Sequence, residues 1–254
     1  GCRMNEFFAL DYHGEPFVLF GTAHLLALAG VVLVNVLIFL FRCRFSEAGR
    51  RTLRYVLAGV LLVVELSWHG WNAATGQWTL QTMLPLHLCS ALVWLSIYML
   101  ITGNQRIYEF AYLLGIPGAL QALLTPDAGI YGFPHFRFFQ VILSHGTLVT
   151  AALALTWVEG YRPTLASLKR VFITGNIYLA AVFVFNLLIG SNYLFIAHKP
   201  ETASLLDVLP PWPWYIAVIE LLGLVFVLVM YAPFFVRDLG ARGKAVQADG
   251  LSSK

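Results

Sequence analysis

The sequence is poor in charge. Only 11% of its 254 residues are charged and 59% are hydrophobic, whereas about 25% of residues are charged in an ordinary soluble domain. This composition excludes a soluble globular protein, and a mean hydropathy of +0.75 indicates that lipid covers much of the apolar surface. The 16 Lys and Arg and 13 Asp and Glu residues are nearly balanced, which gives no support for nucleic-acid binding. We expect a single membrane domain over residues 1–254.

Cysteine is also scarce. Cys2, Cys43 and Cys89 form neither a disulfide framework nor a CxxC metal pair, so any cysteine chemistry depends on a single thiol. We assign no role to Cys2, close to the terminus, or to Cys43, at a membrane edge. The sequence contains no HExxH, Walker, GxSxG or dinucleotide-binding motif. We expect no cofactor and no bound metal. No signal peptide precedes the first apolar run, so we expect that run to direct insertion.

Long apolar runs, by contrast, are abundant. A bilayer core needs about 20 mostly apolar residues per helix. The sequence therefore predicts an all-α fold, a polytopic membrane protein with seven transmembrane helices, near residues 17–41, 54–72, 84–101, 107–124, 137–157, 168–190 and 213–236. In the fourth run, Gly115, Pro117 and Gly118 predict a kink with freed backbone carbonyls.

The basic residues predict the orientation. Arg3, Arg137 and Lys199 fall in or beside one set of alternate loops, and the other thirteen Lys and Arg residues fall on the opposite side. Under the positive-inside rule, the N-terminus is outside and the C-terminus is cytoplasmic, which fits an odd number of spans. The thirteen are Arg42, Arg44, Arg50, Arg51, Arg54, Arg106, Arg162, Lys169, Arg170, Arg237, Arg242, Lys244 and Lys254.

Polar residues within the apolar runs gather toward the outer side. A charged residue in a span costs about 2.5–3.5 kcal/mol on insertion scales, so each such residue is a functional hypothesis. Depths estimated from the rise of an α-helix predict a water-containing pocket that opens toward the outer leaflet. The alternative is that each group is satisfied separately by hydrogen bonds between helices. The outer set comprises His24, Glu65, His69, Cys89, Gln121, Gln140, His145, Asn186, Asn192 and Glu220.

Cys89 and His145 are the predicted catalytic pair. His87 and Cys89 are two residues apart and would point about 200° apart on a helix, so the base for Cys89 must come from another helix. His145 lies at a similar predicted depth, where a neutral imidazole can accept the thiol proton. The alternative is that Cys89 is a small buried hydrophobic residue.

A second set of residues is predicted to bind substrate. Arg137 stands among aromatic residues at the outer interface, where it would either bind a lipid phosphate or extend to the headgroups. The amide of Gln140 or Asn192 is a candidate oxyanion donor. The other residues of this substrate-binding set would orient His145 or the lipid headgroup. The full set is His24, Glu65, His69, His87, Gln140, Arg137, Asn192 and Glu220.

Several segments resemble a known family. These segments, spread from the first span to the seventh, look like those of bacterial YwaF-type membrane proteins and are similar to the transmembrane protein 164 family. That resemblance implies a seven-helix, cysteine-dependent acyltransferase that remodels ether phospholipids, with Cys89 and His145 at the positions of its catalytic Cys and His. It also implies a multi-pass protein of the bacterial cytoplasmic (inner) membrane. More remotely, the sequence resembles the androgen-induced-gene hydrolases, in which a Thr replaces the Cys. The segments are Gly21-Thr22-Ala23-His24, Leu84-Pro85-Leu86-His87-Leu88-Cys89, Phe133-Pro134-His135-Phe136-Arg137-Phe138-Phe139-Gln140, Ser144-His145-Gly146 and Pro210-Pro211-Trp212-Pro213-Trp214-Tyr215.

The hypothesis from sequence is a phospholipid or lysophospholipid acyltransferase with a thioester intermediate. Its partners would be membrane lipids, an acyl donor and a lysolipid acceptor, with no nucleic acid and an open oligomeric state. Four alternatives remain. They are a lipid hydrolase with the same pair, a small-solute transporter, a noncatalytic protein that holds a lipid, and a zinc- or copper-binding protein using His24, His69, His87, His145 and Cys89.

Overall fold

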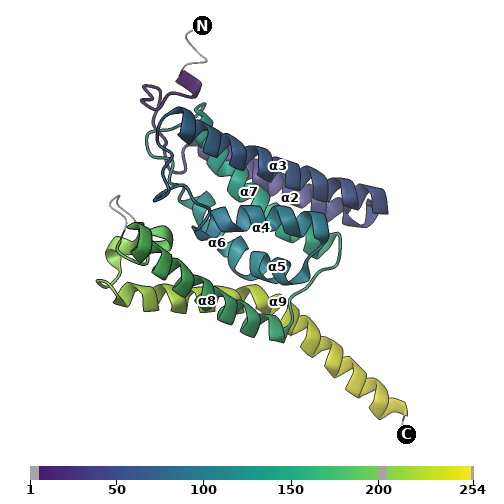
Figure 1. Cartoon of the computed structure of the whole chain (residues 1–254). Coiled ribbons are helices and arrows are strands. Elements are labelled where there is room, and N and C mark those ends of the chain that lie inside the picture. Colours follow the sequence, from purple (N-terminus) through teal and green to yellow (C-terminus); the bar gives the residue numbers. More distant parts are fainter. Residues whose placement is uncertain (1–5, 200–204, 253–254) are drawn as a thin grey trace.

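The computed structural model describes residues 6–199 and 205–252, and in these ranges the fold is all-α (Figure 1). Arg3 and Lys254, counted for the orientation, and Cys2 lie outside the described residues, and the side chains of Arg242 and Lys244 are not described. The main helices are α2 (Thr22–Phe41), α3 (Glu47–Ala74), α4 (Leu88–Thr102), α5 (Gln105–Phe110), α6 (Ile116–Leu124), α7 (Phe136–Trp157), α8 (Leu165–Ile189) and α9 (Trp214–Ser252). Short helical turns are η1 (Arg42–Arg44), η2 (Ala111–Gly115), η3 (Tyr193–Phe195) and η4 (Leu205–Val208).

Six helical segments among the described residues are long and apolar enough to cross a membrane, which makes the chain a multi-pass membrane protein. The helix expected at 84–101 is different, because α4 has only 15 residues. It begins after His87, whose extended backbone forms the N-cap, so residues 84–87 are not part of the helix. The prediction of seven long spans is therefore correct for six, with α4 as a shorter apolar helix. The membrane orientation stays a prediction.

Other boundaries also differ from those expected. α2 begins at Thr22 rather than near residue 17. α3 begins at Glu47 rather than near 54, because Ser46 caps it by accepting the Gly49 N–H, and its first turns lie in the basic segment. α9 continues past residue 236. For α3 a polar cap and for α9 a polar helical turn, which the apolar run does not reveal, set the boundary.

The interruption predicted in the fourth span is a π-helical turn. α5, η2 and α6 follow one another without a break, and η2 (Ala111–Gly115) ends directly before α6, which has Pro117 in its first turn. A π turn is the usual way in which a helix accommodates a residue that does not fit the regular ladder of hydrogen bonds. Pro117 thus changes the helical pitch locally and does not end the helix.

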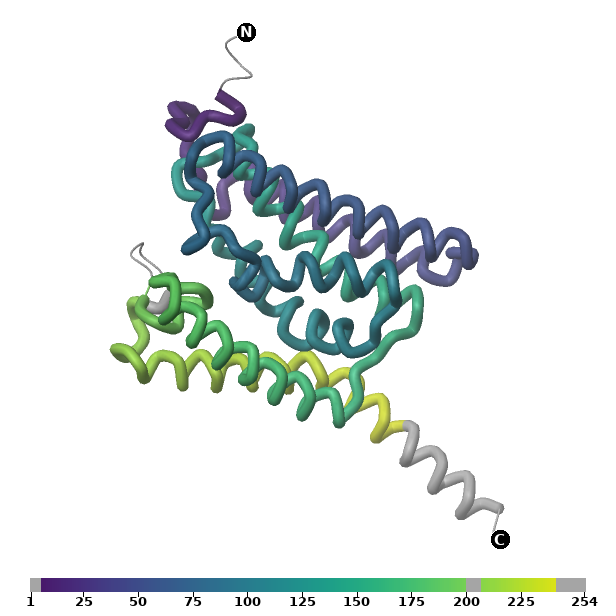
Figure 2. The backbone as a smooth tube through the Cα atoms, in the orientation of Figure 1, coloured from purple at the N-terminus to yellow at the C-terminus, as the bar shows by residue number. Residues whose placement is uncertain are grey.

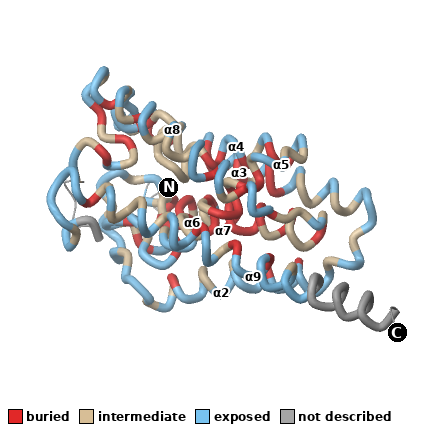
Figure 3. Tube along the Cα trace, turned by 90° about the horizontal axis from the view of Figure 1, so that it is seen from below, coloured by how far each residue is buried: buried red, intermediate tan, exposed pale blue. Residues whose placement is uncertain are grey.

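α7 is the central helix of the bundle. It packs against α2, α3, α4 and α6, and most of its residues are buried (Figure 3). Gly146 permits a close approach by α2, because a Cβ atom there would lie 2.8 Å from Cγ2 of Val31. The α2–α3 and α4–α5 turns and the α7–α8 connection lie at one end of the bundle, the predicted cytoplasmic end (Figures 1 and 2). The starts of α2, α4 and α7 define the predicted outer end.

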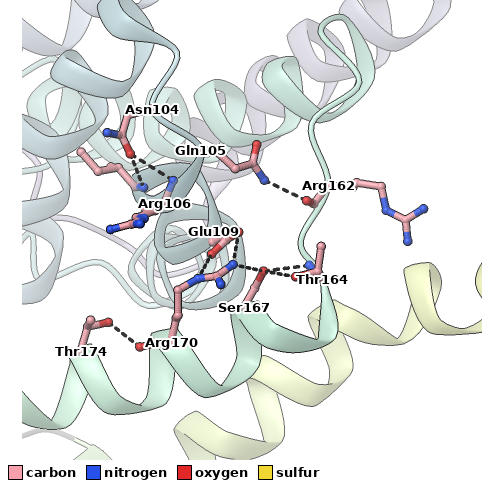
Figure 4. A network of polar contacts seen from close by, with 10 residues as sticks. Asn104, Gln105, Arg106, Glu109, Arg162, Thr164, Ser167, Arg170 and Thr174 are labelled. Atoms are coloured by element: carbon pink, nitrogen blue, oxygen red, sulfur yellow. Dashed lines mark hydrogen bonds and ion pairs between the residues drawn. The ribbon is translucent and has the colours of Figure 1, made fainter.

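An ion pair joins α5 to α8 near the predicted cytoplasmic end (Figure 4). The buried Glu109 carboxylate accepts two hydrogen bonds from Arg170, at 2.8 and 3.0 Å. Ser167 accepts a further bond from Arg170 and forms a capping box with Thr164 at the start of α8. The carboxylate is therefore paired although it lies in an apolar helix.

The N-terminal segment, residues 6–20, covers the predicted outer end of the bundle. The carbonyls of Phe8, Ala9 and Leu10 accept hydrogen bonds from Trp71, His135 and Tyr131, respectively. The Tyr131 ring stacks on the His135 ring, with centroids 4.4 Å apart. Nδ1 of His135 accepts the Arg137 N–H, which identifies Nε2 as the protonated nitrogen and the ring as neutral.

This arrangement predicts acid sensitivity of the N-terminal segment. Burial lowers the pKa of His135, and the Arg137 charge lowers it further, although the Ala9 carbonyl opposes the shift. The unfolded segment then binds a proton that the folded one excludes, so the stability from His135 is full above its unfolded pKa of about 6.5 and is lost as the pH falls below it. We expect hydrogen exchange in residues 6–20 to rise between pH 7.5 and 5.5.

The matched variant is His135→Asn, which keeps a capping acceptor for the Arg137 N–H but does not titrate. We expect its segment to exchange with much weaker pH dependence, and His13 and Asp11 nearby are unchanged in both proteins. An identical acid response in the two proteins would show that His135 is not the cause.

Candidate functional site

Three helices carry the predicted catalytic region. α3 carries Glu65 and His69, α4 carries Cys89, and α7 carries Arg137, Gln140 and His145. Each of these helices packs against the other two. The residues that sequence analysis grouped by estimated depth are thus on neighbouring helices.

Hydrogen bonds at the predicted cytoplasmic end fix the relative heights of these helices. Arg54 of α3 donates to the carbonyls of Leu100 and Ile101 at the end of α4, at 2.6 and 2.9 Å. Tyr161, just after α7, donates to the carbonyl of Gly103, just after α4, at 2.9 Å. These bonds provide a common origin from which positions along the three helices can be measured.

Counted back along each helix from that end, the thiol, the imidazole and the carboxylate have similar estimated depths. At 1.5 Å per residue, Glu65 lies about 17 Å along α3 from Arg54, and Cys89 lies about 17 Å along α4 from Leu100. His145 lies about 18 Å along α7 from Trp157 at its end. We call this shared estimated depth the layer of Cys89, Glu65 and His145.

The His145 ring has a defined tautomer. Its Nδ1 lies 2.8 Å from the carbonyl of Val141, one turn earlier on α7, so Nδ1 carries the proton and Nε2 has the lone pair. His145 is partly buried and Cys89 is partly buried against the apolar core. Among the described residues, no hydrogen bond joins the Cys89 sulfur to His145. The two groups share a layer without being in direct contact.

Three polar or aromatic side chains in contact, Glu65, His69 and Trp78, lead from this layer toward the predicted outer end. Nε2 of His69 lies 3.5 Å from Oε1 of the buried Glu65, one turn away on α3. Nδ1 of His69 accepts the indole N–H of Trp78 at 3.0 Å. This acceptor role places the His69 proton on Nε2, facing Glu65. The sequence grouped Glu65 with His69, and the structure adds Trp78 to this pair.

Arg137 lies near this layer and is enclosed by polar acceptors and an aromatic ring. One guanidinium nitrogen donates to the Gln140 side chain and another to the carbonyl of Asp127, at 3.1 Å. The guanidinium carbon lies 4.2 Å from the centre of the Trp68 ring on α3. Trp68 was not predicted as a site residue, although its position between Glu65 and His69 in the sequence could have indicated it.

His87 points away from this layer. Its Nδ1 accepts the Leu194 N–H at 3.3 Å, and its ring contacts those of Tyr193 and Phe195 at 5.2 and 5.1 Å. His87 therefore joins the start of α4 to the segment after α8. A substrate-binding role for it has no contact with Cys89 or His145 to support it.

His24 and Asn192 are occupied by backbone groups. Nδ1 of the buried His24 accepts the Phe20 N–H at 3.0 Å, and its Nε2 donates to the Leu123 carbonyl at 2.8 Å. Oδ1 of Asn192 accepts the backbone N–H groups of Ala197 and His198, and its nitrogen donates to the His198 carbonyl. Through these bonds, His24 joins the start of α2 to the end of α6, and Asn192 holds the loop after α8.

Glu220 lies between α8 and α9, where its Oε2 accepts a hydrogen bond from Asn176 at 3.3 Å. It belongs to a part of the bundle different from the layer of Cys89. The residues named for a metal site are likewise separated, and no group of three or more His, Cys, Asp or Glu side chains in the described ranges is arranged to hold a metal ion. The structure thus brings together part of the predicted set and distributes the rest.

Comparison with known proteins identifies the family. A family model described as the TMEM164 family matches residues 19–231, a range that includes every predicted site residue. No match was found among curated proteins or among solved structures. The narrower bacterial YwaF-type name is not supported by these comparisons. The chain belongs to the TMEM164 family.

Proposed function

We propose that this protein is a cysteine-dependent membrane lipid acyltransferase in which Cys89 is the nucleophile and His145 is the base. The observation that carries the proposal is the mutual packing of α3, α4 and α7, which carry Glu65, Cys89 and His145 at similar estimated depths. A cysteine with a spatially adjacent histidine on another element is the arrangement required for thiol activation. Membership of the TMEM164 family, which the resemblance in the sequence associates with this chemistry, supports the same assignment.

The protonation state of His145 suits a general base. Nδ1 donates to the Val141 carbonyl, so Nε2 is the nitrogen that can accept the thiol proton. Because the two groups are not hydrogen-bonded in this structure, the transfer requires a bridging water or a small movement when substrate binds. Catalytic hydrogen bonds are commonly long in unliganded enzymes and shorten in the substrate complex.

The reaction has two acyl-transfer steps. In the first, the thiol proton moves to Nε2 of His145, the Cys89 thiolate attacks the ester carbonyl carbon of a lipid, and the ester C–O bond breaks. The proton on His145 passes to the departing lysolipid oxygen, leaving a thioester. In the second step, His145 accepts the hydroxyl proton of a lysolipid, whose oxygen attacks the thioester and releases the thiolate, which is then reprotonated. If water replaces the lysolipid, the same steps give hydrolysis.

Glu65 and His69 are proposed as positioning residues. A carboxylate in the layer of His145 would stabilise the imidazolium that forms during proton transfer, as the acidic member of a catalytic triad does. The hydrogen bond from Trp78 to His69 and the 3.5 Å contact between His69 and Glu65 hold these side chains in place. Glu65 and His69 would therefore affect the reaction through His145.

Arg137 is proposed to bind the lipid phosphate. In the part of the chain that the structure describes, no carboxylate forms an ion pair with Arg137. Its neighbours Gln140, Asp127 and Trp68 orient the guanidinium through neutral acceptors and a ring face. The guanidinium is partly exposed, so a phosphate could reach it and form paired, charge-assisted hydrogen bonds.

The covalent intermediate is the first test of this proposal. During turnover with a phospholipid, intact-mass measurement should detect one acyl group on the protein, removed by hydroxylamine and absent from Cys89→Ala. His145→Gln should lower the rate of acylation about 100- to 10,000-fold, the usual contribution of a general base. Cys43→Ala is the matched control and should retain the adduct, because Cys43 lies in η1, just after α2. Normal turnover in Cys89→Ala would contradict the proposal.

The phosphate assignment has a separate test. Replacing Arg137 with Gln removes charged hydrogen bonds worth about 1.5–3 kcal/mol in total, so kcat/KM for a phospholipid donor should fall about 10- to 100-fold. A neutral acyl donor without phosphate should be affected much less. Equal losses for both donors would assign Arg137 a purely structural role.

A further inference from the structure

Positive charge is concentrated in the turn that joins α2 to α3. Two arginines lie in η1 and two lie in the first turns of α3, whereas Glu47 is the one acidic residue among them. Figures 1 and 2 show this turn at the end of the α2–α3 hairpin that lies away from the N-terminus. The turn contains no residue of the proposed acyl-transfer steps. We call its four basic residues the arginine patch, which consists of Arg42, Arg44, Arg50 and Arg51.

The patch differs from other arginines at the same end of the bundle in its lack of carboxylate partners. Arg54, Arg162 and Arg170 each pair with a carboxylate from another part of the chain, at 4.0, 2.6 and 2.8 Å, respectively. Within residues 6–199 and 205–240, no ion pair includes a member of the patch. Its positive charge is therefore not neutralised by the described part of the protein.

Aromatic rings hold three of these guanidinium groups at the edge of the apolar surface. The rings are exposed and belong to the helical segments that are long and apolar enough to cross a membrane. A guanidinium over such a ring keeps its stem on apolar surface while its charge extends toward the headgroups. The pairs, with the distance from guanidinium carbon to ring centre, are Arg42 and Phe39 at 4.0 Å, Arg44 and Phe41 at 5.2 Å, and Arg51 and Tyr55 at 5.4 Å.

We propose that the arginine patch binds the headgroup of an anionic phospholipid. Guanidinium groups form paired, charge-assisted hydrogen bonds with phosphate oxygens, and basic clusters next to a membrane span attract anionic lipids. Leu40 and Val56, adjacent in sequence to two of the rings, are exposed on α2 and α3 and can contact the acyl chains of the same lipid. A negatively charged amphiphile matches both the charged and the apolar part of this surface. The assignment does not rest on the proposed function.

The experiment compares two pairs of substitutions that remove the same charge from the same end of the bundle. Arg44→Gln with Arg51→Gln removes two exposed members of the patch, and Arg106→Gln with Lys169→Gln removes two exposed basic residues of α5 and α8. Each full-length protein is titrated in detergent with phosphatidylglycerol, which is anionic, or phosphatidylcholine, which is zwitterionic. Native mass spectrometry then measures the amount of bound lipid.

The unaltered protein should bind phosphatidylglycerol more tightly than phosphatidylcholine. Loss of the two patch arginines should weaken phosphatidylglycerol binding about 10- to 30-fold, as expected for two basic residues beside an anionic headgroup. The α5 and α8 pair should change it less than about twofold. Arg44→Lys with Arg51→Lys keeps the charge and should retain most of the binding, which separates loss of charge from loss of folding.

Three results would overturn the assignment. The first is equal affinity of the unaltered protein for the two lipids. The second is an equal loss in the two glutamine variants, because binding would then reflect only the total charge of this end. The third is displacement of phosphatidylglycerol by inorganic phosphate beyond that caused by chloride at equal ionic strength, which would identify a site for a soluble anion.

Discussion

Polar side chains within the bundle must find partners in the protein, because lipid provides none. This constraint divides the predicted polar residues into two groups. His24 and Asn192 use their nitrogen or oxygen atoms to bind backbone groups, and Glu109 is paired with Arg170. His145 retains an Nε2 lone pair, and Arg137 donates its side-chain hydrogen bonds to the Gln140 amide and the Asp127 backbone carbonyl. The candidate chemistry belongs to the second group.

The layer of Cys89, His145 and Glu65 follows from how the helices are held at the opposite end. Arg54 and Tyr161 bind backbone carbonyls at the end of α4, and these bonds fix α4 relative to α3 and α7. Because α4 is short, its first turn lies deep in the bundle, level with the middle of α7. A reactive residue at the start of a short helix thus reaches the same depth as one in the middle of a long helix.

The sequence predicted much of the fold and part of the candidate site. Apolar runs locate the helices, because each residue in a run contributes to the same local signal. Pairing is not local: His24 binds the carbonyl of Leu123, 99 residues away, and His87 turns toward Leu194. The depth estimate grouped Cys89 with His145, a pairing that stays a prediction, and it also included Glu220, since depth alone does not distinguish between helices. Trp68 was missed because an aromatic residue near a membrane surface is usually a lipid anchor.

The most direct test of the account is whether the residues at positions 89 and 145 face one site. In a protein with Cys2 and Cys43 replaced by Ser, His145→Cys adds a second thiol to Cys89, and Cd²⁺ can bridge two thiolates that approach one another. We predict that low concentrations of Cd²⁺ protect both thiols together from maleimide. The control, Leu143→Cys, places the second thiol on the exposed side of α7 and should show no such protection. Independent reaction of Cys89 and Cys at position 145, unaffected by Cd²⁺, would contradict a shared catalytic site.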